Sequence, residues 1–101
     1  MKVKINYQTV VLHIPFGEEN AVKRRRLNDL IGLSDSHTRE LVHQAKCKGE
    51  CILNFQQGEG YFRPNCDDAE KVRHWIRQEN HRIKEQRKAM KGAIDWIRRY
   101  G

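Results

Sequence analysis

The sequence predicts a mainly helical α+β fold, built from three short helices, a two-stranded hairpin and a long C-terminal helix. Three patterns lead to this prediction. Two short amphipathic segments meet at a glycine, and two short β-type segments flank a glycine-rich loop. In the last third of the chain, apolar residues recur every seven positions.

The two segments that meet at Gly32 predict a helix, a tight turn and a further helix. Gly32 ends the helix over residues 23–31, and Ser34 is a suitable N-cap for the helix over residues 35–48. The first of these helices has an apolar face at i, i+3 and i+4, made by Leu27, Leu30 and Ile31. The second is expected to bury Thr38, Leu41, Val42 and Ala45.

The segments that follow predict a hairpin. Residues 51–55 and 61–63 have the composition of strands, and turn-forming residues lie between them. Gly58 and Gly60 permit a positive φ in this connection. The hairpin offers the helices an apolar face made by Ile52, Leu53, Tyr61 and Phe62.

Helix, tight turn, helix and hairpin, in this order, resemble the short winged helix-turn-helix proteins of bacteriophages and prophage elements. The resemblance is carried by residues 18–22, 27–34 and 58–62 and covers the chain from about Pro15 onward. It departs at Asn28, where such motifs usually have a small residue, often Ala. The resemblance implies three helices plus a two-stranded wing. It also implies a DNA-binding role in phage or prophage transcription, replication or excision, in the cytoplasm of a bacterial host.

The N-terminal segment fits two structures. Val3, Ile5 and Tyr7 alternate as in a strand, and β-branched residues favour that choice. A helix is equally compatible with the spacing of Tyr7, Val10, Val11 and Ile14. Because the resemblance requires a first helix, we expect one over residues 7–14, ended by Pro15, whereas residues 1–6 need not be ordered.

The seven-residue spacing predicts one long helix that starts after the N-cap Asn65, reaches about residue 99 and is interrupted at Gly92. Its stripe consists of Ala69, Ile76, Ile83, Met90 and Ile97. Two arrangements stay open for this C-terminal extension, residues 66–101. It packs back on the winged-helix domain, residues 1–65, or its distal part, residues 76–100, forms a homodimer.

The charge balance favours a polyanionic partner. The net charge is +7 and the isoelectric point about 9.6. The excess is spread along the chain, with 10 basic and 7 acidic residues up to residue 65, then 10 and 6. No apolar run approaches the ~18 residues of a membrane span, so we expect no membrane partner. Three cysteines, an odd number, favour reduced thiols in the cytoplasm.

The predicted contacts with double-stranded DNA come from three segments. Four basic residues begin the second helix. Cations at this end oppose the helix dipole, so the run does not serve helix stability. It indicates either contacts with DNA phosphates or a helix start that is simply exposed to solvent. The exposed face of the third helix can bond base edges in the major groove, with Arg39 to guanine as the leading contact. The full set is Lys23, Arg24, Arg25, Arg26, Ser36, His37, Arg39, His43, Gln44 and Lys46, with Gln57 and Arg63 from the hairpin.

No arrangement typical of catalysis is found. The chain lacks a glycine-rich phosphate loop and a Ser-His-Asp or paired-carboxylate pattern, so we expect a non-enzyme without a cofactor. His43, Cys47, Cys51 and Cys66 are candidate zinc ligands. Because Cys47 and Cys51 straddle a helix end and a strand start, we expect no metal. The main alternative to DNA binding is a protein–protein interaction module that acts through the C-terminal helix.

Overall fold

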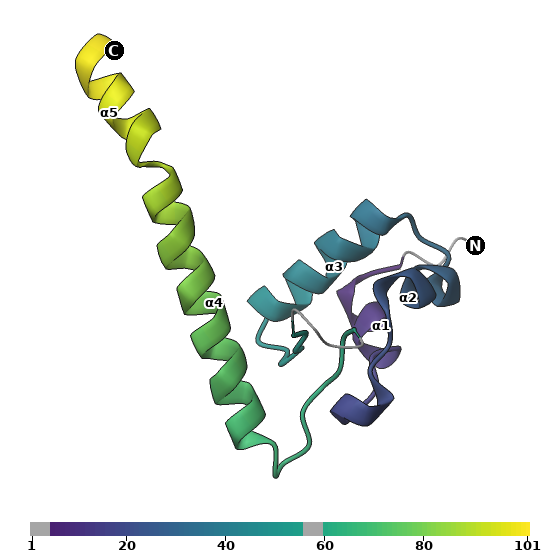
Figure 1. Ribbon diagram of the computed structural model, residues 1–101. Coiled ribbons are helices and arrows are strands. Elements are labelled where there is room, and N and C mark those ends of the chain that lie inside the picture. Colours follow the sequence, from purple (N-terminus) through teal and green to yellow (C-terminus); the bar gives the residue numbers. More distant parts are fainter. Residues whose placement is uncertain (1–4, 56–59) are drawn as a thin grey trace. The chain divides into compact units, whose positions relative to one another are not determined.

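The computed structural model describes residues 5–55 and 60–101 (Figure 1). The chain divides into two compact units, one up to Ala69 and one from Glu70 to Gly101, which are considered separately. The predictions made for Val3, Gln57 and Gly58 fall outside the described residues. The mainly helical architecture is confirmed.

The first element, α1 (Tyr7–Leu12), settles the N-terminal ambiguity at Tyr7 in favour of a helix. Asn6 caps it, since its Oδ1 accepts hydrogen bonds from the backbone N–H of Gln8 at 3.0 Å and of Thr9 at 3.2 Å. The helix ends two residues before the predicted end. Pro15 explains this, because a proline disfavours the helical conformation of the residue before it.

A short 3-10 helix, η1 (Glu18–Asn20), leads to the predicted helix, turn and helix: α2 (Arg24–Ile31) and α3 (Asp35–Cys47). Gly32 ends α2 in the left-handed conformation, at φ 68°. The carbonyl of Asn28 accepts hydrogen bonds from the N–H groups of Gly32 at 2.8 Å and Leu33 at 3.1 Å. Ser34 caps α3, as predicted, because its Oγ accepts a hydrogen bond from the backbone N–H of His37.

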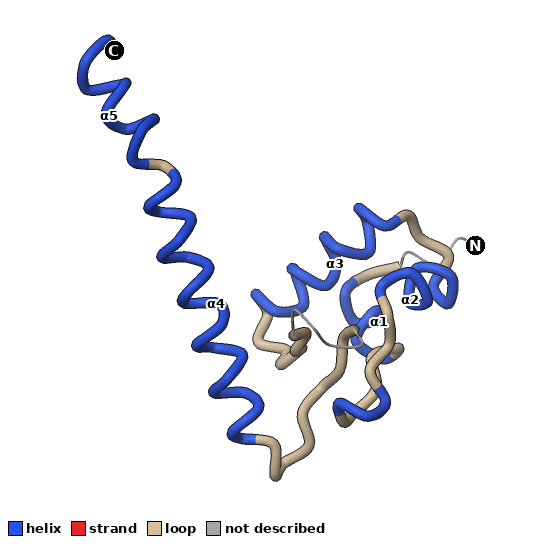
Figure 2. The backbone as a smooth tube through the Cα atoms, viewed as in Figure 1, coloured by secondary structure: helices blue, strands red, loops and turns tan. Residues whose placement is uncertain are grey.

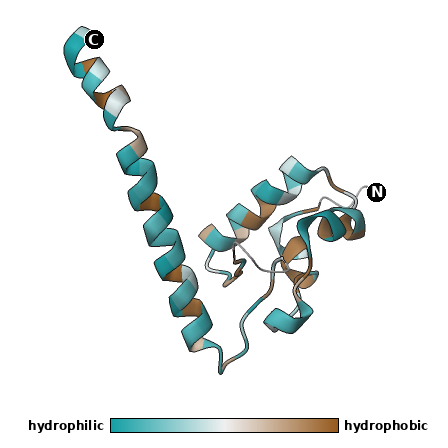
Figure 3. Ribbon diagram, in the orientation of Figure 1, coloured by the Kyte–Doolittle hydropathy of each residue, from teal (hydrophilic) through white to brown (hydrophobic). Residues whose placement is uncertain are grey.

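The core of the first unit forms between α1, α2 and α3 (Figure 3). The predicted buried face of α3 is confirmed in full, and Ile52 and Tyr61 join the same core. The predicted apolar face of α2 is only partly buried. Leu27 and Ile31 are buried, but the prediction was wrong for Leu30, which is 46% exposed. The buried core residues are Val10, Val11, Ile14, Leu27, Ile31, Leu41, Val42, Ala45, Ile52 and Tyr61.

The two-stranded wing is not confirmed among the described residues (Figure 2). Residues 61–63 divide their backbone pairing among three segments. Phe62 pairs with Leu53, through hydrogen bonds of 2.9 and 3.0 Å, while Tyr61 pairs with Val22 and Arg63 pairs with Phe16. A long-range pairing with Val22 and Phe16 therefore replaces the regular ladder that the hairpin pattern predicted.

Gly60 makes this pairing possible. Its φ is 127°, and a Cβ added there would lie 2.1 Å from the carbonyl oxygen of Val22. Only glycine leaves room for the two backbones to approach. The glycine prediction was therefore right at this position, although the partner of the backbone is Val22 and not the opposing strand of a hairpin.

The second unit holds α4 (Ala69–Ala89), apart from its first residue, and α5 (Lys91–Tyr100). The predicted N-cap at Asn65 is wrong, because residues 65–68 form a turn in which the N–H of Asn65 donates to Asp68 Oδ2 at 2.9 Å. The interruption falls at Met90 and not at Gly92, which lies inside α5. None of the described helices is both long and apolar enough to cross a membrane.

Candidate functional site

The exposed face of α3 carries the residues that the sequence singled out for base contacts. Five of them are solvent-exposed: Ser36, His37, Arg39, His43 and Gln44. They lie away from the buried face of the same helix, so the predicted sidedness is confirmed. Hydroxyl, imidazole, guanidinium and amide groups can all donate to or accept from the edges of bases. The face is therefore chemically equipped for hydrogen bonding to a partner.

Lys46 lies at the edge of this face and is half-buried. Its Nζ donates a hydrogen bond to Oδ1 of Asn54 at 3.5 Å. This contact links the last turn of α3 to the residue that directly follows Leu53, which pairs with Phe62. Lys46 therefore has a structural contact in addition to its predicted contact with DNA.

The basic run lies at the start of α2, which packs against α3. Lys23, Arg24, Arg25 and Arg26 are all exposed, whereas Leu27, the next residue, is fully buried. The run thus reaches solvent from the first turn of a helix whose other side is fixed in the core. The helix dipole does not favour these cations at an N-terminus.

Arg24, a member of this run, forms an ion pair within the unit. Its Nε donates to Oδ1 of Asp35, in the first turn of α3, at 2.6 Å. Nδ2 of Asn28 donates to the same oxygen at 3.0 Å. The hydrogen bond from Asn28, followed by the one from Arg24, lowers the pKa of Asp35. Asp35 and then Tyr61 raise the pKa of Arg24.

This cluster explains the unusual residue of the helix-turn-helix pattern. Asn28 occupies the position where a small residue was expected, and its amide bridges α2 to the start of α3. Asp35 was not among the predicted site residues. The only sign of it in the sequence was its acidic side chain in the first turn of a helix. Arg24 and Asp35 are eleven residues apart, so no spacing rule for a single helix relates them.

Arg63 also has an internal role. Its Nε donates to the carbonyl oxygen of Ile14 at 2.7 Å, and its guanidinium carbon lies 4.0 Å from the centre of the Phe16 ring. These contacts hold the end of the α1 segment against residues 61–63. The predicted DNA contact of Arg63 therefore competes with a structural function, and that of Gln57 lies outside the described residues.

The candidate zinc ligands do not gather into a group. Nε2 of His43 lies 3.5 Å from Sγ of Cys47, one turn further along α3. Within residues 5–55 and 60–101, no set of three or more histidine, cysteine or acidic side chains is arranged to hold a metal ion. Cys47, Cys51 and Cys66 are free thiols at exposed positions.

No protein-family model matches the chain, and neither a curated protein nor a solved structure matches it. The likeness to winged helix-turn-helix proteins therefore depends on the residues quoted above. What the geometry provides is a polar helix face on α3, a basic helix start on α2, and an Arg24–Asp35 ion pair between them.

Proposed function

We propose that this protein binds double-stranded DNA, with α3 in the major groove and the start of α2 on the phosphate backbone. The observation that carries the proposal is the exposed polar face of α3, which directly follows α2 and the Gly32 turn. In helix-turn-helix proteins the second helix contacts base edges while the first crosses the backbone. The protein acts by binding and not by catalysis.

Charge supports the same partner. The net charge of +7 favours a polyanion, and Lys23, Arg25 and Arg26 are exposed cations at the start of α2. Arg24 contributes less, since Asp35 already balances its charge. The phosphate contacts of the run thus come less from Arg24 than from its neighbours Arg25 and Arg26.

The biological role that fits this activity is the one the resemblance implies. A short winged helix-turn-helix protein of the phage or prophage type would regulate transcription or assist replication or excision in the cytoplasm of a bacterial host. Such roles need a protein that finds one DNA site among many, which base contacts from α3 would supply.

Arg39 provides the test of base readout. After selection of a preferred duplex, fluorescence anisotropy would compare the parent chain with Arg39→Ala and with Arg77→Ala, an exposed arginine of α4 as the control. A guanine contact predicts a loss of ~1–3 kcal/mol for Arg39→Ala on the preferred duplex and a smaller loss on random DNA. Equal affinity of Arg39→Ala and the parent would remove Arg39 from the site.

A second candidate function is a protein–protein interaction module that acts through the C-terminal helices. The observation that favours it is a group of exposed apolar side chains in α5, where Trp96, Ile97 and Tyr100 are 57%, 61% and 66% exposed. Exposed apolar groups of this kind mark interaction surfaces. A protein that shows no affinity for duplex DNA at low salt would favour this second function.

A further inference from the structure

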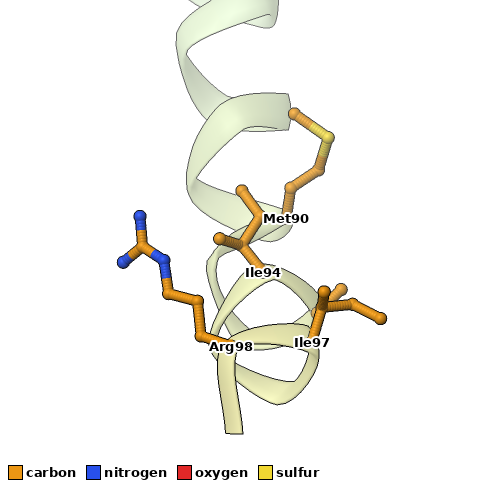
Figure 4. A pocket seen from close by; sticks show the side chains of 5 residues that line it. Met90, Ile94, Ile97 and Arg98 are labelled. Atoms are coloured by element: carbon orange, nitrogen blue, oxygen red, sulfur yellow. The ribbon is translucent and has the colours of Figure 1, made fainter. Parts of the chain in front are cut away.

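DNA binding by α2 and α3 does not use the apolar side of α5. Because successive residues of an α-helix are ~100° apart, the apolar residues from Met90 onward fall on one arc of about 160°. We name this set the α5 face; it comprises Met90, Ala93, Ile94, Trp96, Ile97 and Tyr100. Its large side chains are 45–66% exposed. Four of these residues, together with Arg98, line a shallow apolar depression (Figure 4).

The charges of α5 are kept apart from the α5 face. By the same ~100° steps, all of them fall on the remaining arc: Lys91, Asp95, Arg98 and Arg99. Figure 4 shows Arg98 at the border of the face, beyond Ile94. A partner that covers the α5 face therefore meets a charged group of α5 only at its border, at Arg98, which lowers the cost of burying charge in an interface.

An apolar stripe that runs along α4 and continues into α5 indicates that the partner is another helix. Ile76, Ile83, Met90 and Ile97 are seven residues apart, and each is 47–61% exposed. On a straight helix such a stripe drifts by ~20° per repeat, but it stays on one side when two helices wind around each other. The hydrogen bond of 2.9 Å from the N–H of Ile94 to the carbonyl of Met90 continues the helical path through the interruption.

We infer that the α5 face and this stripe pair with the same surface on a second copy of the chain. In such a pair, apolar residues meet apolar residues, and the charged residues of each α5 stay at the rim of the interface or in water. The Trp96 and Tyr100 rings, with centroids 5.3 Å apart, form the bulkiest part of the surface. The surface has seven half-exposed large side chains, each with about 100 Å² of accessible area. Together they supply about 700 Å² of accessible area per copy, close to the ~800 Å² that each partner buries in a stable interface.

This inference names the partner for the interaction-module function. It also bears on DNA binding, since a dimer carries two α3 helices and would occupy two half-sites. The pairing is measured without DNA, so that its failure and a failure of DNA binding are distinguishable.

Sedimentation of the 101-residue chain over the micromolar range, without DNA, tests the pairing. The parent is expected to shift from the mass of one chain to that of two as its concentration rises. Ile94→Asp combined with Ile97→Asp should lower the association constant at least tenfold. The control is Leu12→Asp, which places one aspartate, half of the charge added in the double variant, at a 78% exposed apolar residue of α1 and should leave association unchanged. Circular dichroism would verify that each variant keeps the helical content of the parent.

Four outcomes would overturn the inference. The first is a parent that stays monomeric at every concentration, including one that binds vesicles of anionic lipid through α5 instead. The second is a dimer that persists in the Ile94→Asp, Ile97→Asp variant, because the α5 face would then not be the interface. The third is equal loss of association in Leu12→Asp, and the fourth is growth beyond two copies without a limit.

Discussion

Asp35, in the first turn of α3, accepts a hydrogen bond of 2.6 Å from the Nε of Arg24, in the first turn of α2. The same carboxylate oxygen accepts from Asn28 at 3.0 Å. One side chain thereby connects the starts of the two helices that form the candidate DNA-binding site. It also engages one arginine of the run that is proposed to contact phosphate, and it adds a polar contact between α2 and α3.

The carboxylate of Asp35 should make stability depend on pH. Because its pKa is lowered in the folded protein, its contribution is present above the ordinary value of 3.8 and is lost as the pH falls through the folded value. Asp35→Asn should therefore be less stable than the parent near neutral pH, and the difference should shrink in acid. Urea denaturation at several pH values would measure this.

Asp29→Asn, which removes an exposed carboxylate from α2, is the control for Asp35→Asn. It changes the net charge by the same amount without touching Arg24 or Asn28. If both variants lose the same stability at neutral pH, the ion pair between α2 and α3 contributes nothing beyond net charge.

Two glycines should respond very differently to alanine. Gly32→Ala should cost ~1–2 kcal/mol, because its φ of 68° is left-handed although the space around it is open. Gly60→Ala should cost more, since the new Cβ would clash with the backbone of Val22 as well as strain φ. Gly92→Ala, in α5 with open space and no positive φ, should not destabilise the protein. Thermal denaturation of the three variants would give the order.

The buried hydroxyl of Thr38 should lower the free energy of unfolding. The side chain is fully buried, and its Oγ1 has no hydrogen-bond partner among the described residues. Thr38→Val replaces that hydroxyl by a methyl group and should stabilise the protein by ~1 kcal/mol. Thr38→Ser keeps the hydroxyl and loses the methyl group, so it should destabilise. Chemical denaturation in which Thr38→Val is the less stable of the two would contradict this account of α3.

Arg24 and Arg25 should differ in their effects on DNA binding, although they are neighbours. Neutralising Arg25 to Gln should reduce the slope of log affinity against log salt by ~0.9 for one lost phosphate contact. Arg24→Gln should change that slope less, because Asp35 already pairs with this guanidinium, and should instead lower stability. Anisotropy titrations at several salt concentrations would compare the two variants. Equal changes in slope would mean that the ion pair opens when DNA binds.

Local patterns in the sequence predicted most of the first unit. The apolar spacing of α3, the turn at Gly32 and the N-cap Ser34 each depend on residues within a few positions, so their signals are visible in the sequence. The wing was predicted from equally local signals and was not confirmed. Phe62 pairs with Leu53, but Tyr61 pairs with Val22, about forty residues earlier, and no local pattern encodes that choice.

The candidate site was predictable in the same uneven way. The exposed residues of α3 followed from the helical period once its buried face was known. The ties of Arg24 to Asp35 and of Arg63 to Ile14 were not predictable, because they join residues that only the folded chain brings together. The predicted interruption of the C-terminal helix was misplaced. Glycine has a low helix propensity, so the interruption was expected at Gly92. The helix is instead interrupted at Met90, and Gly92 lies within α5.

The salt dependence of DNA affinity tests the central claim most directly. Anisotropy with mixed duplex DNA would compare the parent with a variant in which Lys23, Arg25 and Arg26 are changed to Gln. The control removes three exposed cations of the second unit, Arg77, Lys84 and Lys91, and so loses the same charge. The account predicts a parent slope of several units, which falls by about 2–3 in the first variant and changes little in the control. No binding at low salt, or an equal fall in both variants, would contradict a DNA interface on α2 and α3.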